Sequence, residues 1–556
     1  MSGNARGNGQ AQRDHLVVLA PLSIEARAIR SALPGALILQ TGMGRTRSTR
    51  AITGGLPERT TRILEEAGAV AVAGFCGALD PSLRPGDVVV ATQVRGPDGT
   101  RPCPSAGILA AALTAMGIAA RVGPLVSTYH VVSGSERERL RQETGALAVD
   151  MESAWLARAA GDRPFAVLRV VVDTPRRELT GNPLSTALGG LRGYRALAKA
   201  APALASWAEA TGPRTVLLAG PRSFCAGVER AIEIVERALD RYGPPVYVRK
   251  QIVHNVHVVR DLERRGAVFV ESAAEVPAGA TVVFSAHGVS PEVRDQARGR
   301  HLHVIDATCP LVTKVHTEAR RFAGSKYTIF LIGHDGHEEV EGTTGEAPGS
   351  IRLIQNVEDV DGMEVEDPDR VAYLSQTTLA VDEVDEVVGA LRDRFPSLTG
   401  PGSDDICYAT QNRQDAVKVM ARECDLLLVI GSENSSNSKR LVEVAEREGC
   451  RAALIDDETG IDPGWLLGAD TVGVTAGASA PEVLVDRVLD ALAGLGRVAV
   501  EERQVTTESM RFTLPVEIRG VQGGSSNERS EAAADSLAHE AIGLKRSASE
   551  EKEGMR

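Results

Sequence analysis

The stretch DATCPLVTKVH (306–316) decides the fold of the larger part of this chain. A strand-like run ends at Cys309, and Pro310 follows at the position suited to the first turn of a helix. Val315 and Phe322 then recur at helical spacing. The stretch therefore predicts a cysteine at the junction between a strand and a helix.

The same arrangement occurs around two further cysteines, Cys225 and Cys407. Apolar residues at helical spacing follow each of them: Val228, Ile232, Val235 and Leu239 after Cys225, and Val417 and Met420 after Cys407. The intervals between successive cysteines are 84 and 98 residues. This spacing predicts a loose triplication of one α/β unit, visible in the architecture and not in residue identity.

Three cysteines in this setting favour a metal cluster. A thiolate at a helix N-terminus is stabilised by the helix dipole and free N–H groups, and three converging thiolates suit an iron–sulfur cluster. Three protein ligands leave the fourth iron of a cubane open for substrate. Any one of these cysteines alone would more often be an ordinary buried residue; the repeated setting favours ligands. We expect the other four to be dispensable, as core residues (Cys76, Cys424 and Cys450) or as a loop thiol (Cys103).

Composition limits the class of protein. A chain of 556 residues should form several domains, and its 56 glycines and 27 prolines fit an α/β protein with tight connections. The formal charge of −12 argues against nucleic-acid binding. Without a long apolar run or a signal peptide, we expect no membrane partner and a cytoplasmic location.

Alternating apolar and helical patterns divide the chain. Apolar runs, from HLVVLAP (15–21) to FAVLRVVV (165–172), alternate with helical patterns in the first domain, and the break at 211–213 ends it before a fresh strand. The predicted parts are a disordered N-terminus (1–14), a first domain (15–212), a second part (214–520) with lobes at about 214–309, 310–403 and 404–495 and a closing segment (496–520), and a disordered tail (521–556).

Polar, glycine-containing turns follow several strands of the second part, and open α/β sheets bind ligands at the carboxyl ends of their strands. The triplet Ser435–Ser436–Asn437 opens a helix and offers hydroxyl, amide and backbone donors to an oxyanion. Alone it would more often cap the helix. The turns also contain His254, His287, His337, Thr377 and Ser479, and together these residues favour a diphosphate ligand.

The second part resembles the hydroxymethylbutenyl diphosphate reductase family. The motifs that carry the resemblance follow one another in order across 214–520: PRSFCAGVERAI (221–232), VHN (253–255), FSAHGVS (284–290), DATCPLVTKVH (306–316), IGHDGHEEVEGT (332–343), SQTTL (375–379), DDICYATQNRQ (404–414), GSENSSNS (431–438) and VTAGASAPE (474–482). Long motifs in a fixed order are far more specific than one short pattern.

The resemblance implies a three-lobed, pseudo-threefold α/β fold around a central 4Fe-4S cluster held by Cys225, Cys309 and Cys407. It also implies reduction of 4-hydroxy-3-methylbut-2-enyl diphosphate to isopentenyl and dimethylallyl diphosphates, with loss of water and electrons from a ferredoxin or flavodoxin. Thr410 would lie near the cluster, and Thr377 and Glu339 beside the substrate hydroxyl. The diphosphate would be held by His254, His287, His337, Ser435, Ser436, Asn437 and Ser479.

Two acidic neighbours in this family motif differ in what we expect of them. Glu339 stands at a strand's carboxyl end beside His337, and we expect it to be the proton source for the leaving hydroxyl. The alternative is a solvated surface carboxylate like Glu341. Glu338 departs from the family pattern, in which an uncharged residue is expected, so the local electrostatics should differ.

Two other functions would also use such a cluster. An iron–sulfur hydro-lyase removes water without consuming electrons, whereas the reductase needs two per product. A redox sensor would need no diphosphate site, so the donors at the strand ends disfavour it.

The first domain resembles the purine-nucleoside phosphorylase and nucleosidase superfamily in TGMG (41–44), AGFCGAL (73–79) and VDMES (149–153). The resemblance implies that Met151 and Glu152 hold ribose hydroxyls and that Asp173 protonates the leaving purine. Glu25 stands where hydrolytic members keep a water-activating carboxylate. The same residues would also serve as scaffold in a domain without activity.

Overall fold

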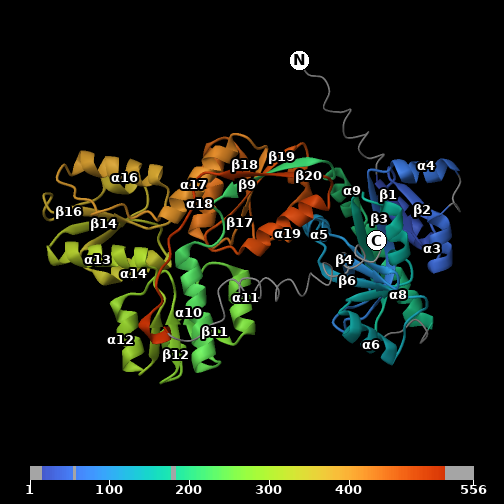
Figure 1. The fold of residues 1–556 in the computed structure, drawn as a ribbon, viewed down its shortest axis with the longest axis horizontal. Helices are drawn as coiled ribbons and strands as arrows, with labels where there is room; N and C mark the ends of the chain where they lie inside the picture. The colour runs from blue at the N-terminus through green and yellow to red at the C-terminus, as the bar shows by residue number, and fades with distance from the viewer. Residues whose placement is uncertain (1–15, 54–57, 177–182, 520–556) are drawn as a thin grey trace, which may run out of the picture.

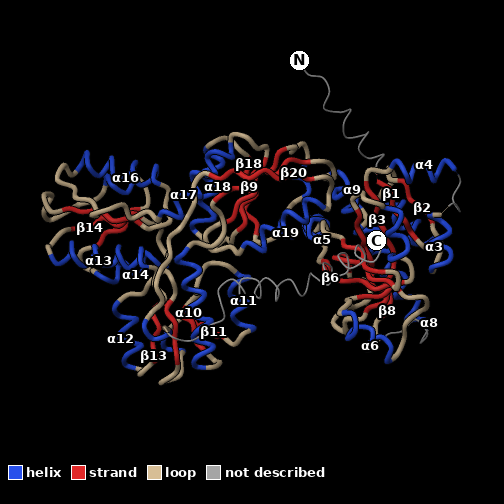
Figure 2. Tube along the Cα trace, viewed as in Figure 1, coloured by secondary structure: helices blue, strands red, loops and turns tan. Residues whose placement is uncertain are grey.

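Four β-sheets organise the computed structural model, which describes residues 16–53, 58–176 and 183–519 (Figure 1). The segments expected to be disordered, 1–14 and 521–556, lie outside the described residues. The chain is an α/β protein, as predicted, with one mixed sheet in its first part and three parallel sheets in its second part (Figure 2). No helix among the described residues has the length and apolar character needed to cross a membrane.

The first part is built on an eight-stranded sheet in the order β2-β1-β3-β7-β6-β4-β5, with β8 paired to β3 and β4. Its strands are β1 (Leu16–Ala20), β2 (Leu37–Gln40), β3 (Ala69–Ala78), β4 (Val88–Gly96), β5 (Gly99–Pro102), β6 (Ala120–Ser127), β7 (Ala148–Asp150) and β8 (Phe165–Asp173). Its helices are α2 (Ser23–Ala32), α3 (Arg45–Ile52), α4 (Glu58–Glu66), α5 (Ala106–Ala115), α6 (Ser135–Thr144), α7 (Ser153–Leu156), α8 (Pro183–Ala200) and α9 (Pro202–Glu209).

Buried side chains on both faces hold this sheet between helices. In β1, Val18 packs with the cluster that includes α2, α5, α8 and α9, whereas Val17 and Leu19 pack on the opposite face with α4 and α7. Alternate residues of a strand point to opposite faces, so a fully apolar strand is buried on both sides. The apolar runs of the sequence predicted these central strands for this reason.

The second part contains three sheets whose strand pairs are all parallel. The first lobe has the order β11-β10-β12-β13, with β10 (Val246–Arg249), β11 (Ala267–Val270), β12 (Thr281–Phe284) and β13 (His303–Asp306), and its helices are α10 (Ala226–Tyr242), α11 (Val256–Arg264) and α12 (Pro291–Gly299). The second lobe has the order β15-β14-β16, with β14 (Thr328–Ile332), β15 (Ile351–Ile354) and β16 (Val371–Ser375), and its helices are α13 (Pro310–Gly324), α14 (Glu338–Glu346), α15 (Glu358–Asp361) and α16 (Val381–Arg394).

The third lobe has the order β18-β17-β19-β9-β20. It comprises β9 (Arg214–Gly220), β17 (Leu426–Ile430), β18 (Arg451–Ile455), β19 (Thr471–Ala476) and β20 (Val498–Gln504), with α17 (Tyr408–Ala421), α18 (Ser436–Arg447) and α19 (Glu482–Ala493). β9 stands at the start of the range expected for the first lobe, yet it pairs with β19 and β20 in the third. The chain therefore enters the second part through its last sheet.

The segment after β20 returns to the first lobe. Ile518 is fully buried against α10, and Thr513 accepts a hydrogen bond from the Arg230 side chain at 2.8 Å. Between these lobes, Glu508 accepts a hydrogen bond from Arg413 of α17 at 3.0 Å. The closing segment thus fastens the third lobe to the first.

The two parts of the chain share one apolar core. A continuous cluster of buried residues runs from α5 and α9 to the third-lobe sheet and α19, where it includes Leu204, Trp207, Leu466 and Val488. Figure 1 shows α5 beside α19. At the domain boundary, the Gly212 N–H donates to the Leu495 carbonyl at 2.9 Å. The two parts are therefore packed together and not joined by a free linker.

We predict that Gly107→Leu weakens this interface by about 1–3 kcal/mol, because overpacking a close contact costs that amount. A Cβ atom at Gly107 would lie 2.9 Å from Cγ of Glu458 and 3.2 Å from its backbone. In calorimetry of the full chain, unfolding of the first part should separate from that of the second and move to lower temperature. Gly389→Leu on α16 is the control, since a Cβ atom there meets open space. Equal behaviour of the two variants would contradict the prediction.

Candidate functional site

Each of the three predicted cysteine ligands occupies the N-cap of a helix: Cys225 of α10, Cys309 of α13 and Cys407 of α17. Backbone N–H groups of the first turn lie near each sulfur and lower the pKa of its thiol: those of Gly227 and Val228, of Leu311 and Val312, and of Ala409 and Thr410 respectively. The free N–H groups of a helix N-terminus favour a thiolate at this position. Thr410, expected near the cluster, is thus one of these residues.

The structure brings the three thiols together. A Cβ atom at Gly227 would lie 2.8 Å from Sγ of Cys309 and 3.8 Å from Sγ of Cys225, so this position needs glycine. Burial raises the pKa of Cys309 to about 11, and burial together with the charges of Cys225 and Cys309 raises the pKa of Cys407 to about 12. Thiols that lose their protons so reluctantly need a bound metal to stay ionised. Three buried, convergent sulfur ligands fit an iron–sulfur cluster.

The four other cysteines lie outside this group. All seven are free thiols. Cys76 and Cys103 are buried in the first part. Cys424 and Cys450 lie just before β17 and β18, with their sulfur atoms 3.5 Å apart.

The three predicted histidines form one cluster beside the cysteine site. The rings of His254 and His287 stack with their centroids 4.1 Å apart, and the His337 ring lies edge-on at 5.8 Å from the first and 6.0 Å from the second. Burial, followed by the charges of neighbouring histidines, lowers the pKa of His254 to about 2. The same causes lower the pKa of His337 to about 4. These two rings are therefore neutral at physiological pH.

The predicted serine and asparagine residues come from the third lobe, and Ser479 among them contacts the histidine cluster. Ser479 donates to the backbone carbonyl of His254 at 2.9 Å, and Ser435 is the N-cap of α18. Ser436 Oγ accepts hydrogen bonds from Gln376 at 3.2 Å and Thr378 at 3.1 Å, which joins the second and third lobes.

Some side chains in this region have buried polar atoms without a partner among the described residues. Both the nitrogen and the oxygen of the Asn437 amide are buried without a hydrogen bond, and so is Nδ1 of His254. Buried polar groups in folded proteins are normally satisfied. These atoms are therefore available to a polar ligand.

Glu339 is a buried acid, not a surface carboxylate. It is 2% exposed and accepts hydrogen bonds from the Thr377 N–H at 2.7 Å and the Thr377 hydroxyl at 3.1 Å. Burial raises its pKa to about 7, although the bonds from Thr377 lower it. The carbonyl of Thr377 accepts from the N–H of Cys407 at 2.9 Å. A group that holds a proton near neutral pH thus lies one residue away from a cysteine of the cluster site.

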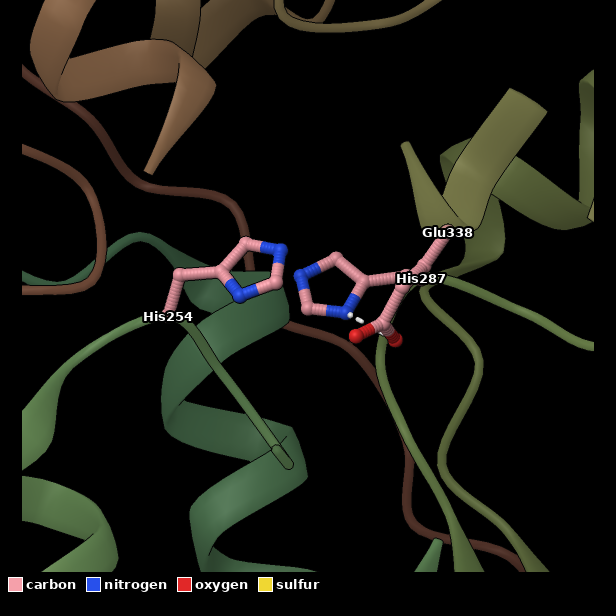
Figure 3. Close-up of side chains that lie close together, drawn as sticks. All are labelled: His254, His287 and Glu338. Atoms are coloured by element: carbon pink, nitrogen blue, oxygen red, sulfur yellow. Dashed lines mark hydrogen bonds and ion pairs between the residues drawn. The ribbon is translucent and has the colours of Figure 1, made fainter. Parts of the chain in front are cut away.

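Glu338, adjacent in sequence, has a different environment. Its carboxylate lies 3.3 Å from Nδ1 of His287 and 3.3 Å from the Ser285 hydroxyl. Figure 3 marks the contact with His287 by a dashed line. Burial would raise the pKa of Glu338, but the hydrogen bond and charge of His287 lower it below its usual value. Glu338 therefore places an ionised carboxylate against the histidine cluster.

The four candidates of the first part line one cavity of about 280 Å³: Glu25, Met151, Glu152 and Asp173. Glu25 accepts from the N–H groups of Leu22 and Phe75, both at 2.6 Å, and burial raises its pKa to about 7. Glu152 accepts from the Gly44 N–H at 2.9 Å. The remaining wall is largely apolar, with Phe75, Val132 and Val172 among its residues.

Asp173 has a charged partner that its expected role did not include. It forms a buried ion pair with Arg137 of α6. A purine base that takes a proton from Asp173 must therefore compete with this guanidinium for the carboxylate. Arg137 could not be predicted from the sequence, because α6 precedes β8 by some twenty residues and carries no motif.

Two contacts near the site were not predicted from the sequence. Arg413 is fully buried and donates to the carbonyl of Ser223 at 2.6 Å, beside Cys225. Gln376 joins Ser436 to the second lobe. Both lie inside motifs of the family resemblance, and that position was the only available indication.

Comparisons with known proteins match both parts of the chain. The family model described as LytB protein matches residues 216–493, and that of the Phosphorylase superfamily matches 36–189. A 4-hydroxy-3-methylbut-2-enyl diphosphate reductase from Mycolicibacterium paratuberculosis is 62% identical over 310 residues, which are 56% of this chain and 93% of that protein. A reductase of the same name from Nocardia farcinica is 60% identical over 312 residues, which are 56% of this chain and 93% of that protein. The solved E-1-hydroxy-2-methyl-but-2-enyl-4-diphosphate reductase of Plasmodium falciparum has a TM-score of 0.53 and 37% identity, covering 55% of this chain and 97% of that one.

We predict that serine at Cys225, Cys309 or Cys407 lowers the iron content and visible absorption of anaerobically purified protein, because each replacement removes one of three ligands. Serine at Cys76, Cys103, Cys424 or Cys450 should leave both unchanged. The measurement is iron per chain together with the visible spectrum. Loss of iron in Cys424→Ser with retention in Cys309→Ser would reject the ligand set.

Proposed function

The chain belongs to the LytB protein family, and we propose that residues 214–520 reduce 4-hydroxy-3-methylbut-2-enyl diphosphate at the site between the three lobes. The observation that carries the proposal is the row of contacts from Cys407 through Thr377 to Glu339. It places a buried acid beside the cysteine site, with the histidine cluster and Asn437 close by. Curated relatives about 60% identical over this part carry the same reductase name.

We propose that the cysteines hold a 4Fe-4S cluster at the centre of a pseudo-threefold arrangement, one cysteine from each of three helices. When bound, the cluster supplies the electrons one at a time. A ferredoxin or flavodoxin is the electron donor we propose.

The diphosphate binds to His254, His287, His337, Ser435, Ser436, Asn437 and Ser479. The support for this is the set of buried polar atoms on Asn437 and His254 that have no partner in the described structure. Phosphate oxygens accept hydrogen bonds from amide, hydroxyl and imidazole donors. The third-lobe residues also add the backbone N–H groups of the α18 N-terminus, which favour an anion.

Glu339 is the proton donor for the leaving hydroxyl, and Thr377 positions it. Reduction consumes two electrons and two protons, breaks the bond between carbon and the hydroxyl oxygen, and releases water. A carboxyl with a pKa of about 7 is still protonated in a good fraction of molecules at neutral pH. Thr377 donates to both carboxyl oxygens of Glu339 and so fixes its orientation.

We predict that Glu339→Gln retains iron and binds the substrate but lowers turnover by at least about 100-fold, the usual contribution of a positioned acid. In the unaltered enzyme, turnover should fall as pH rises through about 7, because the protonated form of a group with a raised pKa is lost above that value. The measurement is anaerobic steady-state reduction with a chemical electron donor across a pH series.

Glu341→Gln is the matched control on the same helix turn, because the Glu341 side chain is exposed and pairs with Lys250. Near-normal turnover in Glu339→Gln would remove the residue from the mechanism. Product formation without electron uptake would instead indicate a hydro-lyase.

A second activity is favoured by the cavity of the first part, a phosphorylase-superfamily domain. We propose that it cleaves an N-glycosidic bond, with Met151 and Glu152 at the ribose and Glu25 activating the nucleophile. Asp173 then acts on the base, which competes with Arg137 for its carboxylate. The support is that all four candidates line a single cavity.

We predict that Glu25→Gln lowers base release from purine nucleosides by at least about 100-fold, because the amide cannot accept a proton from water. The assay is chromatography of free base released by the full chain from a panel of 5′-substituted nucleosides, with and without phosphate. The exposed Glu58→Gln serves as the control. Unchanged release in Glu25→Gln would contradict the role, and release only with phosphate would show phosphorolysis.

A further inference from the structure

Glu338 makes two contacts across the boundary between the first and second lobes. It is the first residue of α14, and both partners of its carboxylate, His287 and Ser285, belong to the loop after β12. The side chains are 13% exposed for Glu338 and 16% for His287. Figure 3 shows the His287 ring between the His254 ring and the Glu338 carboxylate. This carboxylate is therefore built into the histidine cluster.

The Glu338 carboxylate lies in the proposed diphosphate site, and its presence there needs a physical explanation. Like charges a few ångströms apart repel, and the repulsion is strong where water is scarce. The pKa of Glu338 is nevertheless lowered, since the hydrogen bond and charge of His287 outweigh burial. Glu338 thus carries a full charge in the place where the substrate brings further negative charge.

The hydrogen bonds that His287 can make explain how the Glu338 carboxylate and a diphosphate can occupy one site. A neutral imidazole that donates from Nδ1 to a carboxylate has only a lone pair at Nε2, which would face a phosphate oxygen as an acceptor. A doubly protonated imidazole donates from both nitrogens. Of the three rings, His287 is the one that contacts a carboxylate among the described residues: its Nδ1 lies 3.3 Å from Glu338.

The other charged groups around the histidine cluster do not form an ion pair with His287 in the described structure. Lys250 donates to Glu341 at 2.9 Å, and the His334 ring lies 3.4 Å from the Arg440 side chain. The titratable and charged groups that act on the three histidines and on Glu338 are Arg249, Lys250 and His334. Glu339 faces Thr377 and feels His287 only through its charge.

We propose that Glu338 is a positioning residue of the reductase site, which holds His287 as a doubly protonated imidazole so that Nε2–H donates to the substrate diphosphate. This rests on the proposed reductase function. The ion pair turns one of three neutral donors into a charge-assisted one, and charge-assisted hydrogen bonds are roughly twice as strong. Glu338 thus strengthens anion binding at this position.

A metal ion held by the same residues is the alternative use of this triad. The candidate ligand atoms of His254, His287 and Glu338 all lie within 4.8 Å of one another. The two rings stack at an angle of 15°, so their nitrogen lone pairs lie in nearly parallel planes and do not converge on one point. Nδ1 of His287 is also already hydrogen-bonded to Glu338. The geometry favours the ion pair.

The test compares Glu338→Gln with the matched variant Glu341→Gln in the full, cluster-loaded chain. Glutamine keeps the shape and can still accept from Nδ1, but it no longer stabilises the cation. We expect Glu338→Gln to raise KM about ten-fold at about pH 8, with much less effect at about pH 6 where excess protons restore the cation, and with kcat within about two-fold. Binding of inorganic diphosphate, measured by calorimetry at both pH values, should weaken in parallel.

Three results would overturn the proposal. Tighter binding of inorganic diphosphate by Glu338→Gln would show that the carboxylate only repels the anion. An equal loss at both pH values would show a role in shape alone, and an equal loss in Glu341→Gln would show a general effect of charge on α14. If the unaltered chain fails to reduce its substrate, the proposed function fails, while the diphosphate titration still decides the role of Glu338.

Discussion

The second part of the molecule depends on one constraint: three buried sulfur atoms must meet at the N-termini of α10, α13 and α17. Each sulfur is stabilised by the first N–H groups of its own helix, so each helix must point its N-terminus at a common centre. In parallel sheets these N-termini lie at the carboxyl ends of the strands, where polar turns also gather. The geometry that collects the cysteines therefore also collects the histidines, the serines and Glu339. The close approach also requires glycine at position 227, where any side chain would meet Cys309.

The adjacent residues Glu338 and Glu339 show that the environment, and not the residue type, sets the protonation state. Glu339 points into the interior, where burial dominates and raises its pKa to about 7. Glu338 faces the first lobe, where contact with His287 outweighs burial and lowers its pKa. One turn of α14 thus supplies both a proton-holding acid and an ionised partner for an imidazole. Neutral and charged carboxyl groups can then act within one site without exchanging roles.

Local patterns in the sequence predicted the α/β class and the position of each site residue at a strand end or helix start. These features follow from apolar periodicity and from residues that favour helix starts, which act over a few positions. The pairing of β9 with β19 and β20 could not be predicted in this way, because the paired residues are 256 and 284 positions apart in the sequence, as in Val216 with Val472 and Arg214 with Val498. The same holds for Arg137 against Asp173 and for Glu508 against Arg413, since an ion pair between distant segments leaves no periodic trace. Cys103 was predicted to lie in a loop, but its burial was not predicted.

The join between the two parts sets how independently they can act. The third-lobe sheet carries α17 and α18 on one face, while α5 and α9 of the first part cover the other together with α19. The interface reaches Glu458, whose neighbour Asp457 lies 3.2 Å from Nε2 of His257 on α11. His257 is three residues from His254, so a continuous series of contacts leads from α5 to the edge of the histidine cluster. The segment between the two parts is itself hydrogen-bonded to the third lobe through Gly212. The first part is therefore packed against the third lobe, one of the three lobes that form the reductase site.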